Sequence, residues 1–365
     1  MTEADRRALG EFLETRFGAT ERFRLASQEA GSGSSNRTFF VRWGDKELVL
    51  RGAPAHDRVP HLLHDVLAEY DILSALSRTK IPTPDPVAVC ADDAVLGTPF
   101  YLMTQVTGDA MSSLDDGDLS RLTTPEHRRR MGEEAIDTLA SLHTLDRGSF
   151  DVREVPEGPI EEAVEAHTAA LQEASETTGR ELTRALEVAD WLRDHVPEPP
   201  ERRLVHGDYK LDNLLFAPGT PPRIAAVLDW EMAGVGNPLA DLGWFVGLWT
   251  EERDPDPVTP EFEARYGDHE AYDIVVEGTP ATAKSGAPSR AKLVGRYERQ
   301  TGLVFRHDRF YRALGVYKLV VICEKFHAAY LTRPEDAKAT YPVMEVLAPL
   351  LAERAALIVE GRLTL

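Results

Sequence analysis

The sequence predicts an α+β protein built from two lobes, and three observations support this. The first hundred residues contain short strand-like runs, whereas apolar residues at helical spacing dominate the rest. The chain has 365 residues, which is too long for one simple core. The segment Thr107–Asp109 interrupts the pattern between the two parts. We therefore place an N-terminal lobe at residues 1–107 and a C-terminal lobe at residues 108–365.

The composition excludes several classes of function. Hydrophobic residues make up 42% of the chain and charged residues 28%, as in soluble globular proteins. The formal net charge is -20, so the long-range field repels phosphate, and we expect no binding to nucleic acid or to an anionic membrane. Only 8 residues are Lys, against 33 Arg. This acid-rich, Lys-poor balance fits either a salty cytoplasm or a GC-rich genome.

We expect a cytoplasmic protein without a membrane span. The first residues lack the apolar stretch of a signal peptide and favour a helix. The apolar segment Leu314–Cys323 is interrupted by Lys318 and is too short to span a bilayer. Cys90 and Cys323 could pair, but two cysteines do not indicate a disulfide framework, which favours a reduced protein.

The N-terminal lobe is expected to begin with a three-stranded antiparallel meander. Two turn signals, at residues 31–35 and 44–46, separate three strand-like runs. The three runs are Arg22–Ala30, Asn36–Arg42 and Glu47–Arg51. A helix should follow from Pro60 to Leu76, because Pro fits the first helical position and leucines recur at helical spacing. Two further strands are predicted near Pro86–Cys90 and Phe100–Val106.

The C-terminal lobe is predicted to be mainly helical, with the strand Ile224–Leu228 among its helices. The helical segments are Arg128–Leu145, Glu161–His195 (one or two helices), Pro238–Trp249, Arg290–Gln300, Asp308–Tyr330 and Tyr341–Glu360. The segment Glu251–Ala287 is rich in Pro, Gly and acids, and we expect a long, mobile surface excursion there.

The densest chemical signal lies in the segment Leu204–Phe216. Apolar residues at both ends enclose a polar stretch, an arrangement that holds reacting groups on a rigid base. Its polar residues are His206, Asp208, Lys210, Asp212 and Asn213. Asp229 follows directly after the predicted strand Ile224–Leu228. Each Asp or Asn alone commonly caps a turn, but their combination at this spacing favours a functional site.

This set of side chains suits phosphoryl transfer, which depends on positioning and charge neutralisation. Asp208 would orient an acceptor hydroxyl and take its proton. Asn213 and Asp229 would hold Mg²⁺, which prefers oxygen ligands. Lys210 would offset the charge of the transferred group.

The motif His206-Gly-Asp208-x-x-x-x-Asn213, followed by Asp229-Trp230, resembles that of the aminoglycoside phosphotransferase and choline kinase group. The resemblance covers most of the chain and implies a bilobal protein-kinase-like fold, with a small N-lobe of antiparallel sheet plus helix and a larger, mainly helical C-lobe. Asp208 matches the catalytic Asp of the kinase loop, and Asp229 the metal-binding Asp. The resemblance further implies ATP or GTP as donor, Mg²⁺ as cofactor and a hydroxyl group of a small molecule as acceptor, in a monomer or a homodimer.

Three upstream features fit the resemblance to different degrees. The loop after the first strand could cover phosphates through Ser34, Ser35 and Asn36, although a Gly/Ser hairpin is often only structural. Kinase-like proteins have Lys where this chain has Arg51, which keeps the charge but is not interchangeable with Lys. Glu69 is its natural partner. At the hinge, Gln105 and Val106 are candidates to contact the purine through their backbone.

Two further positions are expected to support the site rather than react. Asn237 and Pro238 form a helix start, and the resemblance implies that Asp241 braces the catalytic loop from below. His143 matches a helix end of the family, and we assign it no catalytic role.

The sequence therefore predicts a Mg²⁺-dependent small-molecule kinase with Asp208 as base. The alternative is a catalytically weak kinase-like module that binds a nucleotide or a partner. The presence of Arg51 in place of Lys favours this alternative. A protein kinase fits less well, because no Ala-Pro-Glu segment follows Asp229. The acceptor candidates are Trp230, Glu231, Trp244, Tyr317, Glu324 and His327.

Overall fold

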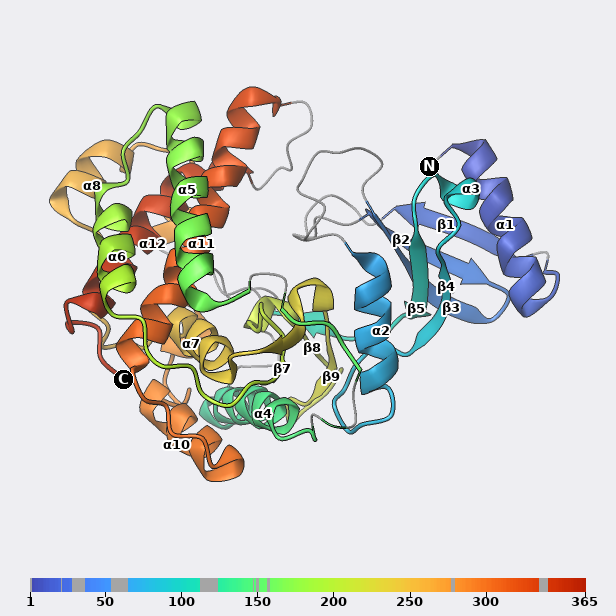
Figure 1. The fold of residues 1–365 in the computed structure, drawn as a ribbon, viewed down its shortest axis with the longest axis horizontal. Helices are drawn as coiled ribbons and strands as arrows, with labels where there is room; N and C mark the ends of the chain where they lie inside the picture. Colours follow the sequence, from blue (N-terminus) through green and yellow to red (C-terminus); the bar gives the residue numbers. More distant parts are fainter. Residues whose placement is uncertain are drawn as a thin grey trace.

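The computed structural model combines an N-terminal antiparallel sheet with a mainly helical C-terminal part (Figure 1). It describes residues 2–20, 22–27, 37–53, 65–111, 124–146, 148, 151–155, 158–276, 280–334 and 341–365. The predicted α+β fold class is confirmed. The sheet lies at one end of the molecule, and the long helices lie at the other.

The N-terminal sheet has five strands in the order β1-β2-β3-β5-β4, and neighbouring strands are antiparallel. The strands are β1 (Phe23–Ser27), β2 (Arg37–Trp43), β3 (Lys46–Gly52), β4 (Pro86–Cys90) and β5 (Phe100–Thr104). The predicted meander is confirmed as β1 to β3. Its first turn, at residues 31–35, and the following Asn36 lie outside the described residues, so Ser34, Ser35 and Asn36 are not described.

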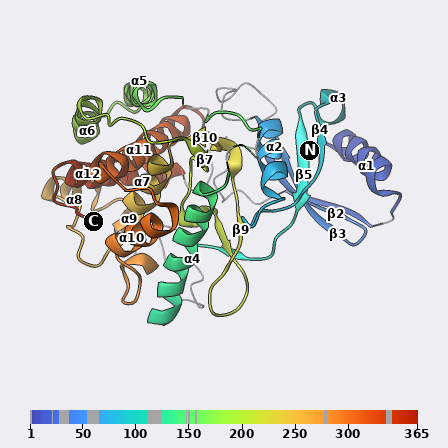
Figure 2. The ribbon, with the colours of Figure 1, turned by 60° about the horizontal axis from the view of Figure 1, so that its bottom comes forward.

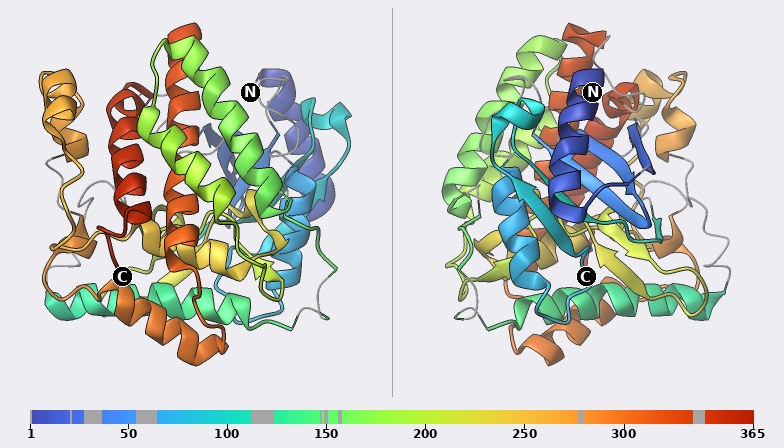
Figure 3. Two further views of the ribbon diagram at one scale, coloured as in Figure 1. Left: turned by 60° about the vertical axis from the view of Figure 1, so that its left-hand side comes forward. Right: turned by 90° about the vertical axis from the view of Figure 1, so that its right-hand side faces the viewer.

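Helices cover both faces of this sheet, with α1 (Glu3–Phe17) on the outer face and α2 (Val66–Leu76) on the face toward the rest of the molecule (Figure 3). Leu48 and Leu50 of β3 pack in one apolar cluster with Leu9 of α1. Side chains alternate between the faces of a strand, so Arg51 points to the opposite face, where α2 lies. The alternation of side chains along β3 thus directs Arg51 toward the interior of the molecule. A short helix, α3 (Asp93–Leu96), connects β4 to β5.

The helix α2 begins later than the prediction at Pro60. Its N-cap is Asp65, whose side chain accepts hydrogen bonds from the backbone N–H groups of Leu67 and Ala68. A carboxylate in this position satisfies N–H groups that have no partner within the helix. Pro60 itself lies outside the described residues.

The C-terminal part is organised around the long helix α11 (Asp308–Thr332), which packs against α5, α6, α7 and α12 (Figures 1 and 2). The other helices are α4 (Pro125–His143), α5 (Ile160–Thr178), α6 (Thr183–Asp194), α7 (Pro238–Leu248), α8 (Pro260–Tyr266), α9 (Tyr272–Val276), α10 (Arg290–Thr301) and α12 (Met344–Val359). The predicted helical segments are confirmed, and Glu161–His195 contains two helices.

Two small sheets lie between the N-terminal sheet and these helices. One pairs β6 (Asp109–Ala110) with β8 (Leu214–Phe216) and β8 with β9 (Ile224–Val227). The other pairs β7 (Arg203–Val205) with β10 (Gly234–Gly236). The segment between β7 and β8 is the polar stretch singled out above, so strands hold it at both ends.

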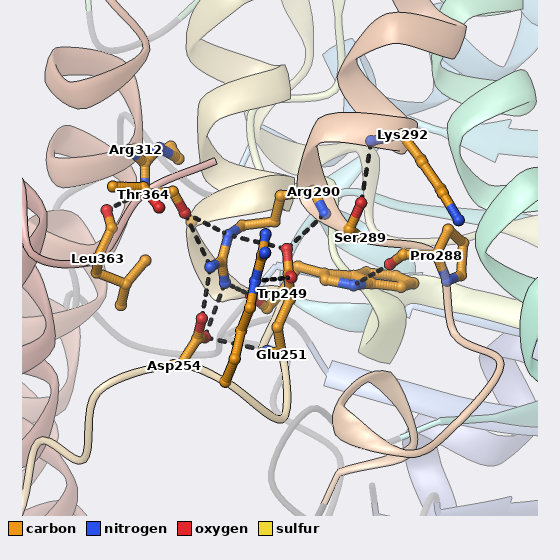
Figure 4. Close-up of polar contacts among 12 residues, drawn as sticks. Trp249, Glu251, Asp254, Pro288, Ser289, Arg290, Lys292, Arg312, Leu363 and Thr364 are labelled. Carbon is orange, nitrogen blue, oxygen red and sulfur yellow. Dashed lines mark hydrogen bonds and ion pairs between the residues drawn. The ribbon is translucent and has the colours of Figure 1, made fainter.

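The segment Glu251–Ala287 differs from the expected mobile excursion. It contains α8 and α9, and Phe262 and Tyr266 are buried against Val346 of α12. Its start is fixed by the buried Arg290, which bonds to the carboxylates of Glu251 and Asp254 (Figure 4). Arg290 Nη1 also donates to the carbonyl oxygen of Trp249 at 2.8 Å, and Nη2 to that of Thr364 at 2.9 Å. Acids and prolines predicted a solvated loop, whereas buried arginine partners order it.

Within the described residues, no helix combines the length and the apolar character needed to cross a bilayer. Cys90 and Cys323 are both buried and unpaired.

Candidate active site

The loop between β7 and β8 holds the carboxylate of Asp208 by two side chains. Lys210 Nζ lies 2.8 Å from Asp208 Oδ1 and 2.7 Å from Oδ2. Asn213 Nδ2 donates to Asp208 Oδ2 at 2.9 Å and to its carbonyl oxygen at 2.8 Å. The hydroxyl of the buried Tyr209 donates a hydrogen bond to Ala135 O at 2.7 Å. This bond anchors the loop to α4. The structure thus brings three of the four predicted catalytic residues into direct contact.

Asp229 lies at the same end of the β8–β9 pair as Asn213. Leu214 of β8 pairs with Val227 of β9, and Leu228 N donates to Asn213 O at 2.8 Å. Asn213 and Asp229 therefore lie close together at the ends of these two strands. Asp229 has φ 66° and ψ 63°, in the left-handed region that non-Gly residues rarely adopt. Such strain is often found where a side chain must point in one direction. The turn places the carboxylate between the two parts of the molecule, where Arg51 reaches it.

The donor chemistry of these two side chains fits Mg²⁺. Asn213 uses its amide nitrogen to bond Asp208, so its oxygen is the remaining atom that can coordinate a cation. Asp229 contributes carboxylate oxygen, and Mg²⁺ commonly takes one or two protein oxygens besides phosphate and water. No group of three or more His, Cys, Asp or Glu side chains among the described residues could hold a metal ion. A metal here would therefore depend on the phosphates of a nucleotide for further ligands.

Arg51 connects β3, α2 and the turn after β9. Its Nη2 lies 2.8 Å from Asp229 Oδ1 and 3.4 Å from Glu69 Oε1. The predicted pairing of Arg51 with Glu69 is present. Burial raises the pKa of Glu69, and the positive charge of Arg51 offsets only part of this shift. Burial also raises the pKa of the Asp229 carboxyl, but Arg51 and Lys210 outweigh it, so the net pKa is lowered and Asp229 is ionised at neutral pH.

Lys210 remains a cation although it is largely buried. Burial lowers its pKa, but the adjacent Asp208 carboxylate outweighs this effect and raises the net pKa above the usual value. Its Nζ lies 5.8 Å from the ring centroid of Trp244 on α7, and Lys318 Nζ of α11 lies 5.1 Å from the same ring. Two lysines thus lie near one indole beside the loop that carries Asp208.

Asp241 of α7 supports the loop from below, as the resemblance implied. Its Oδ2 accepts from His206 N at 2.7 Å, and its Oδ1 accepts from Gly207 N at 2.9 Å. Burial raises the pKa of Asp241, but hydrogen bonding and charge from His143 outweigh it, and the net pKa is lowered. His143 in turn contacts Tyr297 Oη at 2.7 Å through Nδ1. Asn237 caps α7 through a bond from Leu239 N, as predicted.

His206 joins this support to the turn that carries Asp229. Its Nδ1 accepts from Asp208 N at 3.2 Å, so its Nε2 carries the proton and donates to Leu228 O at 2.8 Å. This imidazole therefore links the loop that carries Asp208 to the residue before Asp229.

The remaining predicted residues lie in different places. Gln105 follows β5, and its backbone N–H bonds to Glu47 O at 3.0 Å. Ser34, Ser35 and Asn36 lie outside the described residues. Among the acceptor candidates, Glu324 is buried and paired with Arg180. Trp230, Tyr317 and His327 are buried, and Glu231 is half-buried. Trp244 is also buried, and it lines a cavity beside the loop.

Two residues near the site were not selected from the sequence. Arg153 donates to the backbone carbonyls of Glu231 and Ala233 and lies 4.0 Å from Asp65, the N-cap of α2. An isolated Arg before a helix carries no signal of such a role. Lys318 was noted only because it interrupts an apolar helix segment. A lone cation on a buried helix was the signal that could have identified it.

Solved structures with this fold cover nearly the whole chain. A provisional aminoglycoside phosphotransferase from Ralstonia eutropha JMP134 matches with a TM-score of 0.70 and 23% identity, over 97% of this chain and 98% of that one. A ternary complex of aminoglycoside phosphotransferase APH(4)-Ia with AMP-PNP and hygromycin B matches with a TM-score of 0.54 and 15% identity, over 97% and 99%. At these identities the likeness establishes the fold.

Relatives in sequence come from two groups. Acyl-CoA dehydrogenase family member 11 of Homo sapiens is 28% identical over 339 residues, which are 92% of this chain and 40% of that protein. The chain thus spans about two fifths of the length of this relative. Viomycin phosphotransferase of Streptomyces vinaceus is 26% identical over 213 residues, 55% of this chain and 67% of that protein.

The profile of the phosphotransferase enzyme family matches residues 27–275. This range includes β2 to β5, α2, the loop with Asp208 and the turn with Asp229. The fold, the paired motifs and this match agree: the chain belongs to the phosphotransferase enzyme family.

Proposed function

We propose that the protein is a Mg²⁺-dependent kinase that transfers the γ-phosphoryl group of a nucleoside triphosphate to a hydroxyl group of a small molecule. The nucleotide would lie between an N-lobe of residues 1–107 and a C-lobe of residues 108–365. The observation that carries the proposal is the contact of Lys210 and Asn213 with Asp208, with Asp229 at the same end of the β8–β9 pair.

Asp208 is assigned the role of base. Each carboxylate oxygen can accept more than one hydrogen bond, and Oδ1 accepts one here, from Lys210, whereas Oδ2 accepts two. Oδ1 therefore keeps capacity for the hydroxyl of an acceptor. In that position Asp208 orients the hydroxyl oxygen toward the γ-phosphorus and takes its proton as the new O–P bond forms.

Asn213 and Asp229 are assigned to hold Mg²⁺ through oxygen atoms. When bound, the metal neutralises charge on the phosphates and aligns them for transfer. Arg51 and Lys210 both act electrostatically on the Asp229 carboxylate and would contact phosphate oxygens. The loop with Ser34, Ser35 and Asn36 would cover the phosphates.

The hinge is assigned to the purine. Gln105 O and Val106 N would bond the base, since Gln105 N is already engaged by Glu47. Solved proteins of this fold carry AMP-PNP in one case and GDP in another. ATP and GTP are therefore both donors to test.

Substitution of the base tests the proposal. Asp208→Asn keeps the shape but removes the proton acceptor, so transfer should fall by about 10²- to 10⁴-fold. Binding of AMP-PNP with Mg²⁺, measured by calorimetry, should persist. Asp194→Asn, an exposed Asp at the end of α6, is the matched control and should leave both unchanged. An Asp208→Asn enzyme with near-full turnover would refute the assignment.

The second candidate is a nucleotide-binding module with weak or no catalysis. One observation favours it: Arg51 occupies an oxygen of Asp229 that a metal would use. A thermal-shift measurement with ATP or GTP, with and without Mg²⁺, separates the two together with an ADP- or GDP-release screen over hydroxylated compounds. A Mg²⁺-dependent shift with acceptor-dependent release favours the kinase, and a shift without any release favours the module.

A further inference from the structure

One nitrogen of Arg51 faces three carboxylates. Its Nη2 lies 2.8 Å from Asp229 Oδ1 and 3.4 Å from Glu69 Oε1. The same nitrogen lies 3.8 Å from Glu231 Oε2. Arg51 and Glu69 are buried, and the two acids of the turn after β9 are half-buried. Charges in this cluster therefore interact more strongly than they would in bulk water.

Two polar atoms of the cluster lack a hydrogen-bond partner within the described residues. They are Arg51 Nε and Glu69 Oε2, and both atoms are buried. Burial raises the pKa of Glu69, and Arg51, Tyr101 and the Trp230 backbone act against this shift, yet none of the three gives Oε2 a hydrogen bond. A buried donor and a buried acceptor without partners are both unfavourable, and native proteins keep few of them.

The two unpartnered atoms are complementary. The Nε–H and one Nη2–H of a guanidinium point from the same edge, with the spacing of two carboxylate oxygens. Nη2 of Arg51 approaches Glu69 Oε1 only to 3.4 Å, beyond the usual hydrogen-bond range of about 2.7–3.2 Å. A shift of the guanidinium away from Asp229 and toward Glu69 would let Nε and Nη2 bond the two oxygens of Glu69.

A second buried pair in the same chain has this arrangement. Arg180 Nε lies 3.0 Å from Glu324 Oε1 and 3.1 Å from Oε2, and Arg180 Nη2 also donates to Oε2. The Nε of Arg180 thus has its acceptor, whereas the Nε of Arg51 does not. The difference at Arg51 is the short contact to Asp229, which draws Nη2 away from Glu69.

Asp229 is also the acid assigned to hold Mg²⁺. A divalent cation on either of its oxygens would lie beside the Arg51 guanidinium, and like charges at that range repel each other. Lys210 also acts on Asp229 through its charge, but Arg51 contacts the carboxylate directly. Arg51 and the metal ion therefore compete for one carboxylate, and Glu69 offers the displaced guanidinium a partner within the same cluster.

We propose that Arg51 is a switch with two positions, of which the structure shows the first. In the first position Arg51 bonds Asp229 and hinders the binding of a metal ion alone. In the second, reached when Mg²⁺ and a nucleotide bind together, Arg51 leaves Asp229 and pairs with Glu69 through Nε and Nη2. Its Nη1–H groups then face the phosphates. Lys could not make this exchange in the same way, because one ammonium lacks the two parallel donors. The inference rests on the proposed kinase function and adds how that site is regulated.

The position of Arg51 in the wild-type enzyme tests the proposal directly. Crystal structures are compared without ligand and with AMP-PNP and Mg²⁺. We expect Nη2 within hydrogen-bond distance of Asp229 in the first structure, and Nε and Nη2 on the two oxygens of Glu69 in the second. In solution, ¹⁵N NMR should show slower exchange of the Arg51 Nε–H with water when AMP-PNP and Mg²⁺ are bound. The absence of this signal in Arg51→Lys identifies it.

Metal binding without nucleotide provides a second test, with Mn²⁺ as the probe and electron paramagnetic resonance as the measurement. Arg51→Met removes the competing cation, so it should bind Mn²⁺ at least about tenfold more tightly than the wild type, the effect of one charge-assisted contact. Arg42→Met removes an exposed Arg that pairs with Glu47 and changes the net charge equally, so its Mn²⁺ affinity should match the wild type. Arg51→Met/Asp229→Asn should lose the gain. Circular dichroism verifies that each variant is folded, and the wild-type structures decide the question if Arg51→Met is not.

The possible failures are distinguishable. Contact of Arg51 with Asp229 that persists in the structure with AMP-PNP and Mg²⁺ would overturn the switch, as would equal Mn²⁺ affinity of folded Arg51→Met and the wild type. Neither result would affect Mg²⁺-dependent binding of AMP-PNP, measured by calorimetry. Absence of that binding in the wild type would instead contradict the proposed function, and the Mn²⁺ comparison would still decide whether Arg51 competes with a metal ion.

Discussion

Arg51 Nη2 lies 2.8 Å from Asp229 Oδ1, which joins strand β3 of the N-terminal sheet to the turn after β9. The same nitrogen lies 3.4 Å from Glu69 Oε1 of α2, and all three side chains are largely buried. One guanidinium thus contacts two carboxylates from different parts of the molecule. The position of the proposed metal-binding Asp depends directly on the N-terminal sheet.

Removal of this cation should destabilise the protein. Arg51→Met leaves Glu69 buried without its counter-ion and leaves Asp229 with Lys210 as its nearby cation, at a cost of about 3–5 kcal/mol in the free energy of unfolding. The matched control is Arg42→Met, which breaks an exposed pair with Glu47 at 3.0 Å in the same sheet and should cost at most about 1 kcal/mol. Arg51→Lys retains the charge and should recover most of the stability while raising the KM for nucleotide. Urea unfolding and steady-state kinetics measure these effects, and equal losses in Arg51→Met and Arg42→Met would contradict the role of Arg51.

Gly207 should not tolerate a side chain. Its φ is 82°, and a Cβ there would lie 2.6 Å from Met232 O. We expect Gly207→Ala to displace the Asp208 loop and reduce turnover by about 10²-fold, as small displacements of reacting groups do. Gly302 has a similar φ of 72° but open space around it, so Gly302→Ala should cost only about 1 kcal/mol of stability and leave turnover unchanged. Identical turnover of the two variants would show that the contact with Met232 is unimportant.

Asp241→Asn should loosen the catalytic loop, because an amide nitrogen cannot accept the hydrogen bond that one carboxylate oxygen accepts. We expect a loss of about 1–3 kcal/mol at neutral pH. The pKa of Asp241 is lowered in the folded protein, so its carboxylate contributes fully above the unfolded pKa of about 3.9, and the contribution is lost as pH falls through the lower folded pKa. The stability difference between wild type and variant should therefore be constant at neutral pH and shrink in acid. A difference that grows in acid would contradict this sign.

The buried pair of Arg180 and Glu324 should be structural. Arg180 Nε lies 3.0 and 3.1 Å from the two oxygens of Glu324, and Thr178 Oγ1 donates to Oε1 at 2.6 Å. Arg180→Met should lose about 3–5 kcal/mol, because it leaves a fully buried carboxylate with one neutral donor. The double variant Arg180→Met/Glu324→Leu should recover a large part of that loss. Thermal unfolding of the two single variants and the double variant tests this coupling.

Local patterns in the sequence were sufficient for most of the elements. Short strand-like runs separated by turn signals predicted β2 and β3, and helical spacing predicted α4, α7 and α11. These patterns depend on neighbours within one turn or one strand. The start of α2 at Val66 was missed because the Asp65 cap competes with Pro60, and both residue types signal a helix start.

Long-range contacts account for what the sequence did not predict. The order of the segment after α7 depends on Arg290, which bonds to Glu251 and to Thr364, residues far apart in the chain. The contact of Arg51 with Asp229 and the placement of Lys318 beside Trp244 likewise join separate elements. Local sequence patterns do not predict such contacts between distant residues.

The sequence by itself determined the fold class, the order of most strands and helices, and the loop that carries Asp208, Lys210 and Asn213, because each depends on short-range spacing. The tertiary structure decided which of these groups meet. Asp229 reaches Arg51 because a left-handed turn follows β9 and the strand period aims Arg51 inward. The cavity beside Gly207 exists only where α5, α7 and α11 pack together, so no local pattern in the sequence could predict it.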